Sequence, residues 1–320
     1  MATRMSGKVR TVGGDVEPDT LGPTLIHEHL YVDWGEMLGR PKVFEHSYDQ
    51  IRDAMVAKLQ AARAVGIRTF VDCTPYGCGR YVDLFKDVAA LSGVNVVGST
   101  GFFTETWCPP HPLQKALDVD AQADLFTREI AEGMGATFVR AGMIKVATSE
   151  GRITPHEEKT LRAAARARKA TGCPILAHTT NGMGPEQLDL FESEGLKPEE
   201  VVVSHVGFEP DPFDYAERLL RRGANVSIDR IGFTAFFPDE HWVALLRHVL
   251  GKGYAGQVLL SHDASVFSYG LESASGEHTW NDFGYISRVF VPRLQREVGV
   301  TDAQVRTILE DNPRRVLTFA

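Results

Sequence analysis

The feature that most constrains the fold of this chain is a regular alternation of short apolar runs with longer amphipathic stretches. Eight runs rich in β-branched residues recur, each followed by a turn and then by a segment with helical periodicity. Eight parallel strands joined by helices close into a barrel more naturally than they form one open sheet. The sequence therefore predicts an α/β fold, a (β/α)8 TIM barrel. The eight runs lie at 24–30, 68–73, 95–100, 141–147, 174–179, 200–206, 225–230 and 257–263.

Helix-start signals between the runs support this alternation. Thr154, Pro155 and Glu157 supply an N-cap, a proline at the first helical position and a glutamate at the third. The same capping-box spacing recurs at Ser47 and Thr301. Each signal precedes an apolar-periodic segment, so strand and helix alternate along the whole chain.

The ends of the chain and its linkers bear on domain organisation. No segment rich in proline and glycine divides the 320 residues, so we expect residues 1–320 to form one domain. The segment before residue 20, GKVRTVGG with a following turn, predicts a short N-terminal hairpin that plugs or flanks the bottom of the barrel.

Composition excludes several classes of function. The formal charge of −8 and the absence of a basic run argue against a nucleic-acid partner. The four cysteines form no CxxC pair, which argues against a disulfide framework or a thiolate zinc site. The first twenty residues lack the apolar core of a secretory signal, and no apolar run approaches the ~18 residues that span a bilayer. We therefore expect a cytoplasmic protein with no membrane partner.

The placement of the histidines carries most of the chemical information. His27 and His29 form an HxH pair in the first predicted strand, where side chains at i and i+2 point to the same face. His178 and His205 end the fifth and sixth strands, and Asp263 ends the eighth. Barrel enzymes keep their catalytic groups at these C-terminal strand ends. A lone histidine there is more often a packing residue, but the convergence of four favours a metal site.

Two neighbouring positions refine this prediction. Lys145 ends the fourth strand, where a free ammonium would be a poor neighbour for bound cations. Carboxylation of its amine by carbon dioxide would turn it into a ligand able to bridge two metals. His262 alternates with Asp263, so we expect His262 to face the helices and to be structural. Imidazole and carboxylate donors suit zinc, manganese, cobalt or iron(II).

The motifs GPTLIHEHL, IKVAT, PILAHT, VVVSHVG and LLSHDAS resemble, in order and spacing, those of the phosphotriesterase family of the amidohydrolase superfamily. The resemblance runs from GKVRTVGG to EDNPRRVL at 310–317. It implies two divalent metal ions, one held by His27, His29 and Asp263 and the other by His178 and His205. N6-carboxylated Lys145 and a hydroxide would bridge them, and Asp263 would accept a proton.

Two local features bear on the substrate. IDRIG at 228–232 is similar to the DRxG motif of lactonase-type members, which implies that Arg230 lies near the substrate. STGFF at 99–103 carries Phe103 where many of those lactonases have a tyrosine, so a hydrogen-bond donor for the developing oxyanion is missing. We expect an aromatic pocket mouth formed by Phe102, Phe103, Trp107, Phe267, Tyr269 and Trp280.

These observations predict a hydrolase that opens small lactone esters, with promiscuous phosphotriester hydrolysis. Phosphotriester, amide and phosphorylated sugar lactone hydrolysis on the same site are the alternatives, and a non-catalytic metal-binding barrel is a further one. The family also implies a homodimer, with the loops at 32–39 and 75–82 as candidate contacts.

Overall fold

The computed structural model describes residues 7–39, 46–235, 237–269 and 282–320, and its strands form a closed parallel barrel. One ladder has the order β11-β10-β9-β8-β7-β6 and the other β12-β3-β4-β5. The ladders join because β5 and β6 are two parts of one strand, as are β11 and β12. The predicted (β/α)8 barrel is confirmed. The strands are β3 (Thr24–Asp33), β4 (Thr69–Asp72), β5 (Asn95–Val97), β6 (Ser99–Gly101), β7 (Met143–Thr148), β8 (Ile175–Thr179), β9 (Val201–Ser204), β10 (Asn225–Ile228), β11 (Val258–Leu260) and β12 (Ser265–Tyr269).

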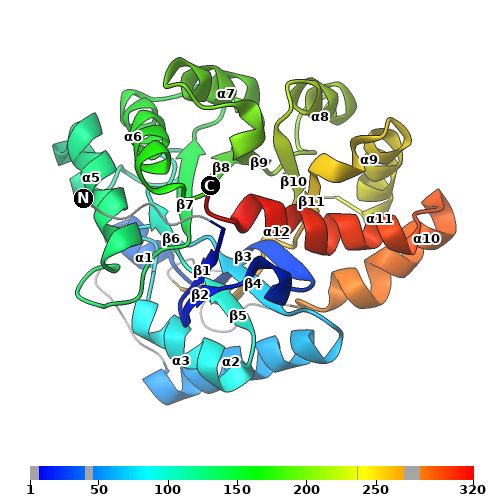
Figure 1. The fold of residues 1–320 in the computed structure, drawn as a ribbon, viewed down its shortest axis with the longest axis horizontal. Helices are drawn as coiled ribbons and strands as arrows, with labels where there is room; N and C mark the ends of the chain where they lie inside the picture. Colours follow the sequence, from blue (N-terminus) through cyan, green and yellow to red (C-terminus); the bar gives the residue numbers. More distant parts are fainter. Residues whose placement is uncertain (1–6, 40–45, 236, 270–281) are drawn as a thin grey trace.

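Helices form an outer ring around these strands (Figure 1). The capping boxes predicted at Ser47, Thr154 and Thr301 are all present. The α-helices are α1 (Trp34–Met37), α2 (Tyr48–Ala64), α3 (Val82–Ser92), α4 (Pro112–Ala116), α5 (Val119–Ala131), α6 (Pro155–Thr171), α7 (Gly184–Ser193), α8 (Pro212–Arg221), α9 (Asp239–Gly251), α10 (Val291–Val298), α11 (Asp302–Arg306) and α12 (Asn312–Leu317). Further helical segments of 3-10 or π type are η1 (Pro18–Thr20), η2 (Pro198–Glu200), η3 (Tyr254–Gln257), η4 (Ile286–Phe290) and η5 (Thr307–Asp311). Within the described residues, none of the helices is both long and apolar enough to cross a bilayer.

The interior of the barrel is a packed apolar core below the strand ends. Parallel strands are covered on both faces, which explains why their sequences read as continuous apolar runs. Val9 from the N-terminal hairpin and Leu317 from α12 pack into the same cluster as the inward-facing strand residues. The strand residues of this cluster are Ile26, Val71, Val97, Met143, Leu176, Val202 and Leu259, with Cys73 just beyond β4.

The hairpin predicted before residue 20 is present and consists of β1 (Val9–Thr11) and antiparallel β2 (Gly14–Val16). In Figure 1 it lies across the middle of the barrel strands. It packs against Gly142, the residue that precedes β7. The hairpin therefore closes the N-terminal end of the barrel and leaves the opposite end open for a site.

The last barrel strand differs from its predicted extent of 257–263. Regular pairing stops at Leu260 and resumes at Ser265, where β12 pairs with β3. The carboxylate of Glu28 accepts hydrogen bonds from the backbone N–H groups of His262 and Ala264, at 2.8 and 2.9 Å. These groups would otherwise be available to a sheet ladder, so Asp263 lies in an irregular segment.

Replacing Gly142 with alanine tests whether the docked hairpin stabilises the barrel. An added Cβ would lie 2.1 Å from the carbonyl oxygen of Arg10 and 2.8 Å from Cγ1 of Val97. We expect Gly142→Ala to lower the free energy of unfolding by about 2–3 kcal/mol in urea denaturation. Gly13→Ala is the control, because its Cβ would meet only the Thr11 hydroxyl, at 3.7 Å. Equal losses in the two variants would contradict this view of the hairpin.

Candidate functional site

Strand β3 brings His27 and His29 to the same face, beside Asp263. The ligand atoms of these three residues all lie within 4.8 Å of one another. Oδ1 of Asp263 is 3.4 Å from Nε2 of each histidine. The structure thus brings together the two histidines that strand periodicity places on one face and the aspartate that the family resemblance adds to them.

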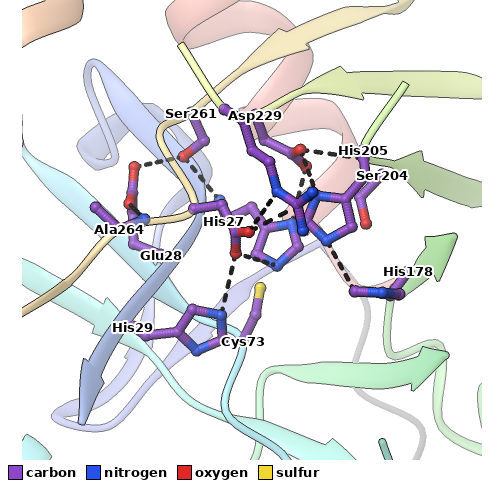
Figure 2. Close-up of polar contacts among 12 residues, drawn as sticks. His27, Glu28, His29, Cys73, His178, Ser204, His205, Asp229, Ser261 and Ala264 are labelled. Carbon is purple, nitrogen blue, oxygen red and sulfur yellow. Dashed lines mark hydrogen bonds and ion pairs between the residues drawn. The ribbon is translucent and has the colours of Figure 1, made fainter. Parts of the chain in front are cut away.

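A second group lies next to the first. Nδ1 of His178, at the end of β8, is 2.8 Å from Nε2 of His205, which directly follows β9. Nζ of Lys145, on β7, is 2.7 Å from Nε2 of His27. Figure 2 shows His27 and His29, both from β3, with His205 and His178 from the ends of the neighbouring strands β9 and β8. All six predicted metal-ligand positions therefore meet at the C-terminal ends of the strands.

A buried carboxylate that the sequence analysis did not single out orients two of these histidines. Oδ2 of Asp229 accepts a hydrogen bond from Nδ1 of His27, and Oδ1 accepts one from Nδ1 of His205, both at 2.8 Å. With Nδ1 engaged, each ring presents Nε2 to the centre (Figure 2). Nδ1 of His29 is held in the same way by the Thr74 hydroxyl, at 2.8 Å. Asp229 precedes Arg230 in the IDRIG motif, which was the signal available for finding it.

Burial sets the protonation of the centre. Desolvation lowers the pKa of His27 to about 3 and lowers the pKa of the Lys145 amine from its usual value. Burial alone would raise the pKa of Asp229, but its contacts with His205 and His27 outweigh this and hold that pKa below its usual value. Burial likewise lowers the pKa values of His178 and His205, so these imidazoles are neutral, which is the form that binds metal. The ionised Asp229 accepts hydrogen bonds from the ring N–H groups of His27 and His205.

Strained backbone positions two of the candidate ligands. His205 and Asp263 have φ angles of 63° and 53°, a left-handed conformation that is uncommon for residues other than glycine. The Glu28 contacts hold the segment around Asp263, while Nδ1 of His262 donates to Oε1 of Glu28 at 2.7 Å. His262 is completely buried, so its predicted structural role agrees with its place in the structure. Glu28 itself was not anticipated.

A cavity of about 610 Å³ opens above the centre. Phe103 and Trp107, both predicted substrate contacts, line it with ring centroids 5.3 and 5.8 Å from that of His178. Arg230 also lines it, with Nε 2.9 Å from Oδ2 of Asp263. The wall near the candidate ligands is therefore aromatic, with one guanidinium group.

Three other residues predicted for the aromatic mouth, Phe102, Phe267 and Tyr269, are not brought to the cavity. Phe102 is completely buried among aromatic rings behind β6, because consecutive residues point to opposite sides of an extended chain. Phe267, on β12, is buried against His46 and Tyr269. Phe102 and Phe267 thus pack in the core, which corrects their predicted placement. Trp280 lies outside the described residues.

Comparison with known proteins agrees with this geometry. The model of the phosphotriesterase family matches residues 7–317. The chain belongs to this family. A phosphotriesterase homology protein of Mycobacterium tuberculosis is 34% identical over 319 residues, covering 97% of each chain. An aryldialkylphosphatase of Saccharolobus solfataricus is 30% identical over 322 residues, covering 96% of this chain and 99% of that protein.

Solved structures of this family also superpose on the chain. A mutant of a phosphotriesterase-like lactonase from Deinococcus radiodurans superposes with a TM-score of 0.87 at 33% identity, covering 98% of this chain and all of that one. The phosphotriesterase family consists of hydrolases that depend on two metal ions. This member is a hydrolase of that family, and its described residues include two groups that could hold a metal ion: His27, His29 and Asp263, and His27, His205 and Asp229.

Replacing Asp229 with asparagine tests its orienting role. Asparagine keeps one oxygen, but its amide N–H₂ group would face the second Nδ1–H, so one of the two rings loses its acceptor. We expect metal affinity to fall about 10- to 100-fold, measured by calorimetric titration of the apoprotein with zinc. Asp189→Asn removes the same charge from the exposed face of α7 and should leave the affinity unchanged. Equal affinities in the two variants would contradict the orienting role.

Proposed function

We propose that this protein opens small lactone esters with a two-metal centre and hydrolyses phosphotriesters as a side activity. The observation that carries the proposal is the convergence of two groups of candidate ligands, with the Lys145 amine 2.7 Å from Nε2 of His27. His27, His29 and Asp263 would hold one ion, and His178 and His205 the other. Bound divalent cations supply Lewis-acid activation of water and of the substrate's carbonyl or phosphoryl group.

The donor set fits such ions. Neutral imidazole nitrogens and carboxylate oxygens suit zinc, with cobalt, manganese or iron(II) as other candidates. We assign zinc as the first ion to test, because the donors include four histidines and no thiolate at ligand distance among the described residues.

We also propose that Lys145 is N6-carboxylated in the active protein. Burial lowers the pKa of its amine, so the nucleophilic neutral form is favoured. Attack of the amine on carbon dioxide forms an N–C bond and releases one proton. The product would be a carboxylate beside His27. The anion attracts metal ions, whereas a protonated lysine would repel them.

Asp263 is proposed as the proton acceptor during hydrolysis. Burial alone would raise its pKa, but His205, His27 and Arg230 hold that pKa well below its usual value, so the group is ionised at neutral pH. Arg230 contacts it with Nε at 2.9 Å and stacks over the ring of Phe208, with the guanidinium carbon 4.6 Å from the ring centroid. The side chain that orients Asp263 thus also forms part of the substrate cavity.

The choice of lactones rests on the cavity wall and the relatives. Arg230 of the IDRIG motif lies in the cavity, as the lactonase resemblance implies, and one solved relative is a phosphotriesterase-like lactonase. The aryldialkylphosphatase relative supports triester hydrolysis as the side activity. Phosphotriesters, amides or phosphorylated sugar lactones as main substrates are the alternatives. The homodimer, the cytoplasmic location and the single domain stay predictions.

A metal-dependence assay tests this function. Protein stripped with a chelator should lose all hydrolysis, and two equivalents of zinc per chain should restore it. On the restored protein we expect kcat/KM for lactones to exceed that for paraoxon-like triesters at least about tenfold. Asp263→Asn should retain part of the metal and lose activity, which would count against a non-catalytic barrel. Metal-loaded protein that is inert to lactones would overturn the lactonase proposal.

Phe103→Tyr tests the wall beside the centre. The ring lies next to His178, so a hydroxyl added there would place a hydrogen-bond donor near the reacting carbonyl. We expect kcat/KM for simple lactones to rise about tenfold, by steady-state kinetics at fixed zinc. Phe233→Tyr adds the same hydroxyl elsewhere in the cavity and should leave kcat/KM within about twofold. No difference between the variants would argue that position 103 does not contact the carbonyl.

A further inference from the structure

The side chain of Glu157, completely buried in the first turn of α6, bonds to more donors than a helix cap requires. Its Oε1 accepts hydrogen bonds from the Glu105 backbone N–H at 2.9 Å, the Ser149 hydroxyl at 2.6 Å and the Thr104 hydroxyl at 3.1 Å. Its Oε2 accepts from the backbone N–H groups of Ser149 at 3.0 Å and Thr154 at 2.9 Å. Only the bond from Thr154 belongs to the capping box.

The other two α-helical capping boxes show what capping alone needs. Gln50 and Gln304 perform the same task at Ser47 and Thr301 on exposed surfaces, each with a neutral amide. Their side-chain oxygens bond within the box. The Glu157 carboxylate therefore accepts further hydrogen bonds from residues that do not belong to its capping box.

These donors come from two loops at the cavity. The loop after β6 carries Phe103 and Trp107, and the loop after β7 begins at Ser149 and carries Glu150. The loops also contact each other, because the Glu150 backbone N–H donates to the Thr106 hydroxyl at 3.2 Å. Trp107 remains 42% exposed, so burial of its own ring is only one part of what holds it beside His178.

We propose that Glu157 is a positioning residue for substrate recognition, which fastens these two loops so that Phe103 and Trp107 form a fixed wall of the cavity. Hydrogen bonds to an ionised carboxylate are stronger than those between neutral groups. A cavity wall that is already fixed lowers the entropic cost of binding a substrate that carries a long chain. The proposal rests on the proposed ester hydrolysis for the identity of that substrate. The geometry of the loops does not depend on it.

Glu157→Gln separates positioning from capping. Glutamine can close the capping box through its oxygen, as Gln50 and Gln304 do, so α6 stays capped. Its amide N–H₂ group would then face the Glu105 N–H, a donor without an acceptor. Glu158→Gln is the matched control on the same helical turn, because the Glu158 side chain is half-buried, lies outside the Glu157 contacts and pairs with Arg162.

The first measurement is hydrogen exchange by mass spectrometry, which needs no turnover. In Glu157→Gln we expect exchange in 103–107, where the Glu105 N–H loses its acceptor, to rise about tenfold, with α6 unchanged. Glu158→Gln should match the wild type. Equal exchange in both variants and the wild type would overturn the proposal.

The second measurement compares long-chain and short-chain lactones on the zinc-loaded protein. In Glu157→Gln we expect KM for the long-chain lactone to rise about fivefold, with kcat and the short-chain KM within about twofold of the wild type. Equal changes for both lactones would overturn the positioning role.

If neither lactones nor triesters are hydrolysed, the proposed function fails. Calorimetric binding of long- and short-chain alkyl phosphonates then makes the same comparison, and loss of long-chain preference in Glu157→Gln alone supports the positioning role.

Discussion

The centre depends on one buried carboxylate shared between two imidazoles. Asp229 is fully enclosed and engages Nδ1 of both His27 and His205, so strands β3, β9 and β10 are tied together at a single point. A charge in this place is tolerated because donors surround it, and removal of one partner from a buried pair typically costs about 3–5 kcal/mol. The same bonds fix which nitrogen of each ring faces the cavity. Fold stability and ligand geometry therefore rest on the same contacts.

Much of the architecture and of the ligand set could be predicted from the sequence. Period-two alternation placed His27 and His29 together, and the barrel rule placed His178, His205 and Lys145 at the same end. These predictions need only local pattern and strand order. The residues of the aromatic wall were harder to predict, because a local sequence pattern does not indicate which side chains of an irregular loop face the cavity. Phe103 reaches it, while its neighbour Phe102 packs behind β6.

The contacts that the sequence did not reveal join residues distant along the chain. Asp229 meets His27 across 202 positions, and Glu28 meets His262 across 234. No local periodicity records such pairs. Glu28 also explains why the last strand breaks, since its carboxylate takes the N–H groups on both sides of Asp263. An irregular segment at this point was not predictable from an apolar run that continues to Leu260.

The close approach of β6 to β7 limits how the cavity can diversify. Gly101 lies so near Lys145 that a Cβ there would come 1.8 Å from the Lys145 carbonyl oxygen, and its φ of 114° disfavours other residues. Any side chain at this position would displace the backbone that carries the lysine. New substrate preferences reached through this loop must therefore begin beyond Gly101, at side chains such as Phe103 and Trp107 that face the cavity. In laboratory evolution of the pocket, we therefore expect Gly101 to stay unchanged while positions after it vary.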